Sequence, residues 1–446
     1  MDLKACLVKL EQENRLLRIV AEVDPVHELA GVAAKLEGDK VVLFENVKGY
    51  SQPVVCGLLW NRENLACLFD TEAGKLPFLF ADAVKNVEYE KFLPVEVDKP
   101  AAQELIMLEP DLFSISTPTL ALKDGGPYYS SSVVIAKDPD TGVRNLSVHR
   151  LMVTGKNRMT MLMDVGRHLR DYYERAEKLG KPLEITINNG VDPAVYFAAI
   201  TPSSAVAIDQ DELTVAGFLR GKPVELSRSQ TVAVEGIADA QLIIEGEILP
   251  MVRETEGPFG EVTGYYGPAD ERWVVNVKAI TSQKDPVIQT LLPGKEVWNS
   301  VGLMAEASIF QTISRQVAGV KGVYLSHGGC GFYHAYVQMD PPRKGMAKNA
   351  ILATFAAFAP LQMVTVVNSD VNILDAEDVQ RAMATRFVPD QDLVLLPKSF
   401  GHELNPATEG GYGAKIGFDC TYPLPKSPDY ERVSFQEVDL AQYVKV

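Results

Sequence analysis

Two glutamates on either side of a short turn form the pattern in this sequence that is best suited to proton chemistry. Glu256 and Glu261 flank a Gly-Pro-Phe-Gly segment, and proline and glycine restrict such a segment to a turn. Two carboxylates held across a rigid turn, with an arginine nearby, suit proton transfer to a reacting carbon. Their spacing alone does not decide this, because acids beside turns are usually exposed to solvent.

Polar residues in two other segments have the types that bind metal ions or anions. The segment RNLSVHR at 144–150 alternates like a strand and carries Asn145, His149 and Arg150. The segment VGRHLRD places His168 in a basic helical turn. Most histidines on helices are structural or exposed, so His168 by itself does not predict a metal site.

The elements that must position these residues predict three domains and a mixed α/β (α+β) fold. Residues 1–112 alternate between helical and strand patterns. Residues 113–300 contain short β-rich runs separated by turn signals, which is typical of a meander or barrel. Residues 301–446 return to an α/β pattern. Helices are predicted near 3–16, 26–38, 164–179, 209–220, 344–358 and 374–387, strands near 15–24, 40–47 and 363–373, and a proline-rich connector at 95–115.

Composition limits the classes of partner. The chain has 446 residues, of which 46% are hydrophobic, and a net charge of −16, which disfavours nucleic acid and anionic membrane surfaces. Five scattered cysteines give no disulfide framework or zinc knuckle. The N-terminal segment predicts an amphipathic helix and not a signal peptide, so a cytoplasmic protein is expected. The apolar stretch 350–367 contains Pro360 and Gln362, which favours a buried helix followed by a strand over a membrane span.

Generic nucleotide-binding, serine-hydrolase and zinc-protease motifs are absent from the sequence. Several longer segments, in this order, are instead similar to motifs of the UbiD family of reversible decarboxylases. The resemblance runs from about residue 110 to the end of the chain, and a series of ordered motifs is more specific than any one of them. The segments are KDPDTGVRNLSVHRLMV at 137–153, GRHL at 166–169, DELTVAGFLRGKPVEL at 211–226, LIIEGEI at 242–248, EGPFGEVTGYY at 256–266, VNSDVNILDAEDVQRAMATR at 367–386 and AKIGFDCTYP at 414–423.

This resemblance implies a cofactor and a metal site. Family members hold the phosphate of prenylated FMN through Mn²⁺ or Mg²⁺, usually with K⁺ nearby. The ligands carried over to this sequence are Asn145, His168 and Glu212, whose oxygen and imidazole groups suit such ions. The resemblance implies cofactor binding by Asn145, Ser147, Val148, Arg150, Arg167, His168 and Glu212.

The resemblance also implies catalytic roles for Arg150, Glu256 and Glu261. CO₂ would leave from a covalent adduct with the prenylated flavin, and Glu261 would then protonate the carbon. Arg150 would anchor the substrate carboxylate and pair with Glu256. Arg150 lies five residues after Asn145, so a regular strand would place the two on opposite faces and a bulge or twist is required.

The family's architecture supplies further expectations. It implies a central split β-barrel that binds flavin and a C-terminal α/β domain for oligomerisation, giving a homodimer or homohexamer. A flavin prenyltransferase would supply the cofactor. The loop 201–212 is longer than the family's usual loop, so its contacts to the cofactor and K⁺ are not assigned. Arg167 replaces an uncharged residue and is expected to add a phosphate contact, and Asp370 is the acid that remains in a usually acid-rich segment.

The substrate expected from the resemblance is a (hetero)aromatic or α,β-unsaturated carboxylic acid. A furan dicarboxylate or a phosphorylated alkenyl acid is the alternative, and would need extra cations such as Lys295, Arg315 or Arg343. The segment 291–311 should border the pocket, where Trp298, Leu303, Met304 and Phe310 either line it or pack in the core.

Two other functions remain open from the sequence. One is a noncatalytic UbiD-like subunit of a multi-subunit carboxylase, which would not need Arg150, Glu256 and Glu261. The other is a metal-dependent hydrolase using the same three metal ligands without flavin.

Overall fold

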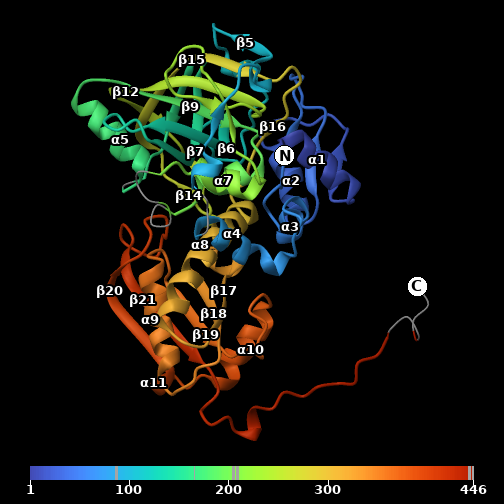
Figure 1. The fold of residues 1–446 in the computed structure, drawn as a ribbon, viewed down its shortest axis with the longest axis vertical. Coiled ribbons are helices and arrows are strands. Elements are labelled where there is room, and N and C mark those ends of the chain that lie inside the picture. Colours follow the sequence, from blue (N-terminus) through green and yellow to red (C-terminus); the bar gives the residue numbers. More distant parts are fainter. Residues whose placement is uncertain (86–88, 165, 203–205, 207–209, 440–442, 444–446) are drawn as a thin grey trace.

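The computed structural model describes residues 1–85, 89–164, 166–202, 206, 210–439 and 443. The N-terminal and central parts lie together, and the C-terminal sheet with its helices forms a second body beneath them (Figure 1). Residues 431–439 run away from this body as an extended tail. The mixed α/β fold class is confirmed.

The N-terminal part is a four-stranded sheet with helices, ordered β1-β2-β3-β16. The helices and strands predicted for its first half are present, with shorter bounds than expected. Strand β16 belongs to the central part of the sequence, so it ties the two parts into one unit. The elements are α1 (Leu3–Gln12), β1 (Leu16–Ile19), α2 (Glu28–Leu36), β2 (Val41–Phe44), β3 (Val54–Cys56), α3 (Arg62–Leu68), α4 (Leu76–Lys85) and β16 (Ile288–Gln289).

The central part is a closed six-stranded barrel, as the barrel prediction required. Its strands follow the order β12-β9-β6-β7-β8-β15, and pairing of β12 with β15 closes the ring. Apolar side chains such as Val134, Leu151 and Ile244 are fully buried in the core packed around it. The strands are β6 (Tyr128–Lys137), β7 (Arg144–Gly155), β8 (Arg158–Met161), β9 (Leu183–Asn189), β12 (Leu242–Glu256) and β15 (Asp270–Ser282).

Short elements accompany the barrel. The helices α5 (His168–Lys178), α6 (Pro193–Ala199) and α7 (Leu213–Arg220) connect or cover its strands, and β10 (Glu225–Ser227) pairs with β11 (Gly236–Ile237). The connector prediction for 95–115 was incomplete. That segment contributes β4 (Val95–Glu96) beside β10 and β5 (Leu105–Met107) beside β15, because both strands find partners far away in the sequence.

A bulge interrupts the pairing of β6 with β7 beside Arg150. Tyr129 pairs with Leu151, but the next regular pair is Ser132 with His149. Two residues of β6 therefore face the single residue Arg150, and such bulges re-aim a side chain. The extra residue lies in β6, and Asn145 to His149 pair regularly with it, so this pairing does not contain the bulge expected within β7 between Asn145 and Arg150.

The C-terminal part is a five-stranded sheet ordered β17-β18-β19-β21-β20. Helix α9 (Met346–Ala357) covers it, and α10 (Ala376–Arg386) and α11 (Pro389–Asp392) follow β19. The strand expected at 363–373 ends at Val367, and Asp370 beyond it pairs with Arg386 at 2.6 Å. The strands are β17 (Val320–Leu325), β18 (His334–Met339), β19 (Met363–Val367), β20 (Leu393–Phe400) and β21 (Tyr412–Cys420).

The apolar stretch 350–367 is divided between α9 and β19, as its interrupted pattern predicted. Within the described residues, the search for a helix that is long and apolar enough to cross a bilayer finds none.

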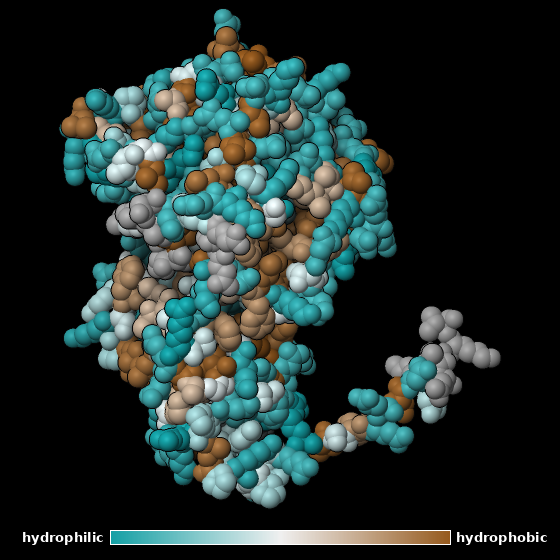
Figure 2. Space-filling model, in the orientation of Figure 1, coloured by the Kyte–Doolittle hydropathy of each residue, from teal (hydrophilic) through white to brown (hydrophobic). Residues whose placement is uncertain are grey.

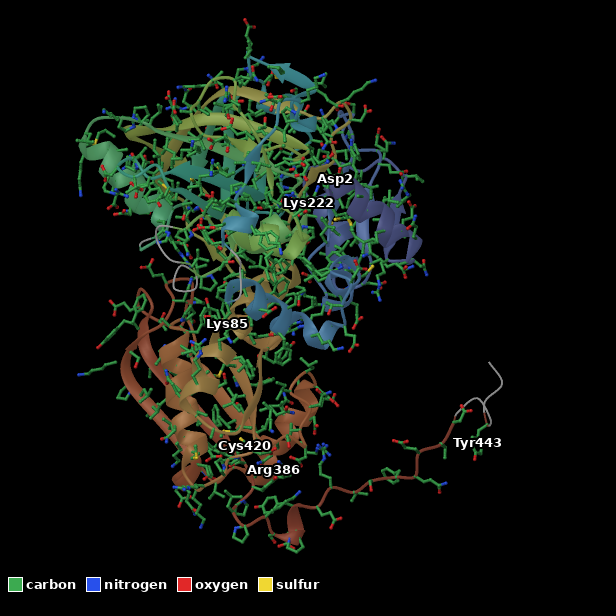
Figure 3. The ribbon with its side chains drawn as sticks, viewed as in Figure 1. Asp2, Lys85, Lys222, Arg386, Cys420 and Tyr443 are labelled. Carbon is green, nitrogen blue, oxygen red and sulfur yellow. The ribbon has the colours of Figure 1, made fainter. Side chains whose placement is uncertain are left out.

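Helix α8 (Lys295–Gln316) joins the three parts and has 22 residues. Glu306 on this helix accepts from Arg62 of α3 at 2.7 and 2.9 Å and from the backbone of Leu325 in β17 at 2.8 Å. Glu306 is fully buried, so the pair fixes the helix between the N-terminal and C-terminal sheets. In Figure 3 the labelled Lys85, at the end of α4, lies where the upper body meets the C-terminal body that contains Cys420 and Arg386.

Hydrophobic side chains lie exposed along the tail. Val433 and Phe435 are 84% and 89% exposed, and the tail is partly brown in the hydropathy surface (Figure 2). No described part of the chain covers them.

Candidate active site

Arg150 joins the two glutamates that flank the Gly-Pro-Phe-Gly turn. Its Nε and Nη2 donate to both oxygens of Glu256, at 2.9 and 3.0 Å, while its Nη1 donates to Glu261. Glu256 is fully buried, and the side chains of Arg150 and Glu261 are 10% and 12% exposed. The structure therefore brings together the three residues predicted to be catalytic, from β7, the end of β12 and the loop after β13 (Phe259–Gly260).

The turn backbone holds the two carboxylates at a fixed separation. Gly257 has a φ of +91°, a conformation that side chains disfavour, and a Cβ there would lie 3.0 Å from the carbonyl oxygen of Pro268. Strand β13 pairs with β14 (Tyr266–Gly267), and the Glu261 backbone donates to the Tyr265 carbonyl at 2.8 Å. Glu261 is thus held by a small hairpin and not by a free loop.

Burial and charge act in opposite directions on these groups. Burial alone would lower the pKa of Arg150, but the carboxylates of Glu261 and Glu256 raise it above its ordinary value, so the guanidinium is charged. Burial raises the pKa of Glu261, and the guanidinium opposes that rise. A carboxyl group with a raised pKa holds a proton more readily at neutral pH, as a general acid requires.

Tyr128 is a further member of this cluster that the sequence did not indicate. Its hydroxyl donates to Glu256 at 2.9 Å, and its ring packs at 4.4 Å from that of Phe259. The guanidinium of Arg150 lies 4.9 Å over the Phe259 ring. Tyr128 precedes Glu256 by 128 residues, so only the closed barrel brings the two together.

We expect Tyr128→Phe to lower the decarboxylation rate by about tenfold while the protein stays folded. The change removes the hydrogen bond that the Tyr128 hydroxyl donates to the buried Glu256. A lost hydrogen bond to a charged group costs about 1.5–3 kcal/mol. Steady-state rates and thermal unfolding of the two proteins would measure it. Tyr129→Phe is the matched control, because Tyr129 is the next residue, is equally buried and packs in the core around the barrel. Equal rate losses in both variants would contradict the role of Tyr128.

The three predicted metal ligands also lie close together. The Oδ1 of Asn145 on β7 is 3.2 Å from Nδ1 of His168, the first residue of α5. Glu212, the N-cap of α7, accepts at 3.3 Å from the backbone of Leu146, next to Asn145. Three segments far apart in the sequence thus meet at one point.

The donor set fits a divalent cation. Burial raises the pKa of Glu212 to about 8, and no arginine or lysine appears among the groups that affect it. Among the described residues, no cluster of three or more His, Cys, Asp or Glu side chains has metal-binding geometry. The present set relies on an amide oxygen together with one imidazole and one carboxylate, which suits Mn²⁺ or Mg²⁺ better than Zn²⁺.

Ion pairs brace the strand and helix that carry Asn145 and Glu212. Arg144 donates to Asp211 at 2.7 Å and to Glu235 at 3.0 Å, and Lys137 donates to Glu235 at 2.7 Å. Because Asp211 precedes Glu212 and Arg144 precedes Asn145, this network fixes the two expected ligands relative to each other.

The other residues predicted to bind cofactor lie around the same strand. The Ser147 hydroxyl is 2.9 Å from His149 Nε2, and His149 Nδ1 is 3.0 Å from the Leu162 carbonyl, so His149 is held on both sides. Val148 packs against the large core cluster. Arg167 is the exposed N-cap of α5 beside His168. Residues 203–205 and 207–209 of the 201–212 loop lie outside the described residues.

Four apolar residues of α8 were considered for the pocket, and the structure divides them between the core and the catalytic turn. Leu303 and Met304 are buried in the core, and the Phe310 ring packs at 5.4 Å from that of Phe78. Only Trp298 reaches the catalytic turn, where its Nε1 donates to the Val262 carbonyl at 2.7 Å.

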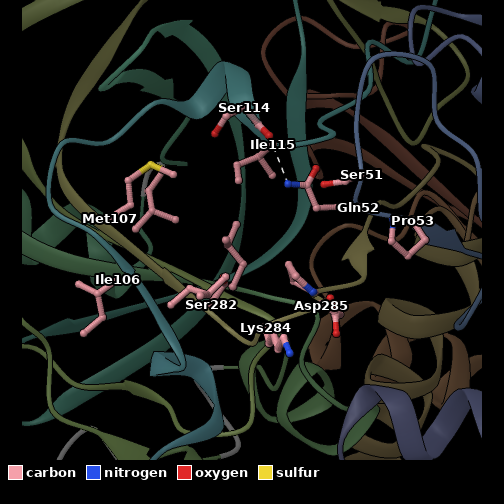
Figure 4. A pocket seen from close by; sticks show the side chains of 14 residues that line it. Ser51, Gln52, Pro53, Ile106, Met107, Ser114, Ile115, Ser282, Lys284 and Asp285 are labelled. Atoms are coloured by element: carbon pink, nitrogen blue, oxygen red, sulfur yellow. Dashed lines mark hydrogen bonds between the residues drawn. The ribbon is translucent and has the colours of Figure 1, made fainter.

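A cavity of about 380 Å³ lies elsewhere, between β5, the end of β15 and the loop that contains Gln52. Figure 4 shows its lining, where Gln52 donates to the carbonyl of Ser114 at 3.2 Å. None of the predicted catalytic, cofactor or metal residues lines it. The chemistry is therefore centred on Arg150 and not on this cavity.

Comparisons with known proteins identify the family of the chain. Family models of 3-octaprenyl-4-hydroxybenzoate carboxy-lyase match residues 7–83 (N-terminal domain), 94–296 (Rift-related domain) and 299–420 (C-terminal domain). An uncharacterized protein from the cooM 5' region of Rhodospirillum rubrum is 46% identical, over 98% of this chain and 95% of its own.

Relatives with stated activities are decarboxylases. Anhydromevalonate phosphate decarboxylase of Methanothermobacter thermautotrophicus is 35% identical over 93% of this chain and 96% of its own. Gallate decarboxylase of Lactiplantibacillus plantarum is 31% identical over 95% of this chain and 94% of its own.

A solved structure is similar over the whole chain. The UbiD-class enzyme HmfF of Pelotomaculum thermopropionicum, in complex with FMN, has a TM-score of 0.95 and 39% identity, covering 100% of both chains. An evolved dimeric form of HmfF was solved with prenylated FMN. With its three domains matched in order, this chain belongs to the UbiD family of carboxy-lyases and is a decarboxylase.

Proposed function

We propose that this protein is a reversible, non-oxidative decarboxylase of a (hetero)aromatic or α,β-unsaturated acid, with prenylated FMN, Mn²⁺ or Mg²⁺, and K⁺. The observation that carries the proposal is Arg150 bound to both Glu256 and Glu261 in a buried cluster. Burying two carboxylates and a guanidinium costs free energy even when they are paired. A noncatalytic subunit would not require such a cluster, so its presence favours a catalytic role.

When bound, prenylated FMN supplies the electron sink that no side chain provides for the carbanion left by CO₂. The residues Asn145, His168 and Glu212 would hold the metal ion and, through it, the cofactor phosphate. Arg167 and Ser147 lie beside this set and would contact the phosphate or the flavin ring.

The chain's own groups then orient the acid and manage its proton. The Arg150 guanidinium orients the substrate carboxylate and excludes alternative poses. Glu256, held by Tyr128 and Arg150, keeps that guanidinium in place. Glu261 carries the proton that reaches the carbon after CO₂ leaves, and in the carboxylation direction it removes it.

The test of the proposal is co-expression with a flavin prenyltransferase, followed by a visible spectrum, intact cofactor mass and CO₂ release on a panel of acids. A bound prenylated flavin and CO₂ release are expected. A colourless, metal-only protein that hydrolyses esters or amides would favour the metal-dependent hydrolase instead. A flavin-free protein without either activity would favour the noncatalytic subunit.

We expect Glu212→Gln to weaken Mn²⁺ binding by at least tenfold. The change removes the negative charge from the ligand set and retains the shape of the side chain. Titration of the cofactor-free protein with Mn²⁺, followed by electron paramagnetic resonance, measures this without turnover. Glu174→Gln on α5 is the control, because Glu174 is half-buried and pairs with Arg170 on its own helix. Unchanged Mn²⁺ affinity in Glu212→Gln would exclude this residue as a ligand.

A homodimer or homohexamer built through residues 301–446 is part of the same proposal. Support comes from the tail, where Val433 and Phe435 are exposed. The substrate acid and CO₂ are the small-molecule partners, and a flavin prenyltransferase is the cofactor supplier.

A further inference from the structure

The segment that precedes β6, residues 118–126, lies along the catalytic turn. Oδ1 of Asp124 accepts from the backbone N–H of Gly260 at 2.9 Å. The backbone N–H of Gly125 donates to the Pro258 carbonyl at 2.8 Å. Since Gly260 directly precedes Glu261, two neighbouring residues of this segment bind the peptide groups that lead into the proposed proton donor.

These two contacts occupy one edge of β13, the short strand of the turn. Successive peptide groups of an extended strand point in alternate directions, so the Pro258 carbonyl and the Gly260 N–H point to the same side. The opposite edge of β13 pairs with β14, where Phe259 lies across from Gly267. The Asp124 carboxylate thus takes the place of a backbone carbonyl on a neighbouring strand, and β13 is held on both edges.

The segment approaches the turn too closely for a side chain at Gly125. A Cβ there would collide with the carbonyl oxygen of Gly257, and such close approaches of two backbones require glycine. A Cβ on Gly260 would also lie only 3.2 Å from the Cβ of Ala121. The two backbones are therefore in direct contact, so a shift of the segment must move the turn.

The segment is itself fixed at both ends. The Thr119 backbone donates to the Pro25 carbonyl at 3.1 Å and accepts from the His27 backbone at 2.9 Å. The Tyr128 backbone, at the start of β6, donates to the Pro118 carbonyl at 3.0 Å. The N-terminal part and the barrel thus brace the segment that carries the aspartate.

Backbone N–H groups engage both oxygens of Asp124. Oδ2 accepts from Ala121 at 2.8 Å, and the Asp124 backbone donates to the Ala121 carbonyl at 3.0 Å. Burial raises the pKa of the Asp124 carboxyl, and the N–H groups of Ala121, Gly260 and Leu120 oppose that rise. The half-buried side chain is oriented by its own turn, which directs Oδ1 to the catalytic turn.

We infer that Asp124 is a positioning residue for the decarboxylation, which sets the Glu261 carboxyl against the reacting carbon by holding the Gly260 N–H. It acts through the backbone of the turn and exchanges no proton with the substrate. Misplacing a reacting group by about 1 Å can lower a rate by about 100-fold, so this hydrogen bond acts on turnover more than on binding of the acid by Arg150. This inference rests on the role proposed for Glu261.

The first test is a double-mutant cycle on holoenzyme containing prenylated FMN and Mn²⁺, with 2-furoate and 4-hydroxybenzoate as the acids. Asp124→Ala should lower kcat at least tenfold and change KM less than threefold, because Arg150 still binds the acid. In a Glu261→Gln background the same change should lower the single-turnover rate less than twofold, since residues that act on one step are not additive. Equal losses in both backgrounds would overturn the inference, as would a kcat within twofold of the unmodified enzyme.

Asp419→Ala is the matched control. Asp419 is another half-buried aspartate that accepts from a backbone N–H, that of Thr421 at 3.1 Å, but it lies at the end of β21. Its removal should leave kcat within twofold. Asp124→Asn keeps an oxygen for the Gly260 N–H and should recover most of the kcat lost in Asp124→Ala. An equal loss in Asp419→Ala, or no recovery in Asp124→Asn, would contradict the positioning role.

Hydrogen–deuterium exchange of the peptide 257–262 tests the contact without turnover. Asp124→Ala should accelerate exchange there at least tenfold and leave the barrel strands unchanged. If Asp124→Ala does not fold, Asp124→Glu takes its place in both tests, because it displaces the carboxylate by one methylene group. Unchanged exchange at 257–262, or an equal increase throughout the barrel, would overturn the inference. Failure of the proposed function is distinct, since it would appear as absent prenylated flavin, no CO₂ release from either acid, or full activity in Glu261→Gln.

Discussion

Glu261→Gln is expected to lower decarboxylation by about 10²–10⁴-fold, the range that a lost general acid produces. The amide retains the size of the carboxyl group and its contact with Arg150, but it cannot deliver a proton to the carbon. Because Glu261 lies outside the expected metal and phosphate contacts, cofactor and Mn²⁺ content should be unchanged. The measurements are CO₂ release and the exchange of the product's ring hydrogen with deuterated water.

Deuterium exchange makes this prediction specific. Exchange needs only the proton-transfer step, so it should disappear together with CO₂ release. Glu271→Gln is the matched control, since Glu271 is an exposed acid on β15 that accepts from Thr255 at 3.1 Å. Full exchange in Glu261→Gln would assign the proton to another group.

Arg150→Met should destabilise the barrel and abolish turnover. The change removes the guanidinium from Glu256, which is fully buried, and from Glu261, which is 12% exposed. Breaking a buried pair typically costs about 3–5 kcal/mol because charges remain without a partner. Urea unfolding, followed through the fluorescence of the barrel residue Trp273, measures the lost free energy of unfolding. This loss should be smaller at low pH, where the two carboxylates are protonated and no longer need the guanidinium.

Arg158→Met provides the comparison for stability. Arg158 pairs with Glu254 at 2.7 Å between β8 and β12, and both side chains are more than one third exposed. Such a pair contributes about 0–1 kcal/mol. If Arg150→Met unfolds at the same urea concentration as Arg158→Met, the central cluster is not the buried charge network described above.

Predictions from periodicity succeeded where an element had one buried face. The helices expected near 3–16, 164–179 and 374–387 exist with shorter ends, and the barrel strands occupy the expected turns and runs. Helix α8 was not predicted, although it is 22 residues long. It is enclosed by three parts of the molecule and buries polar residues such as Glu296 and Glu306, so it has no simple apolar stripe.

The sequence by itself determined the chemistry available to this protein. The order of its motifs named the family, and the residue types at 145, 150, 168, 212, 256 and 261 limited the site to an oxygen-and-imidazole cation set and one arginine with two acids. These residues can be identified from the sequence without knowing where they lie in the fold.

The tertiary structure alone decided which of these groups touch. Arg150 meets Glu256 and Glu261 across 106 and 111 residues of sequence, and Tyr128 joins them from β6. Local sequence carries no record of such contacts, because they arise when the barrel closes and the C-terminal sheet packs on α8. Closure also removes water from the site, which makes the pairing of its buried charges energetically necessary.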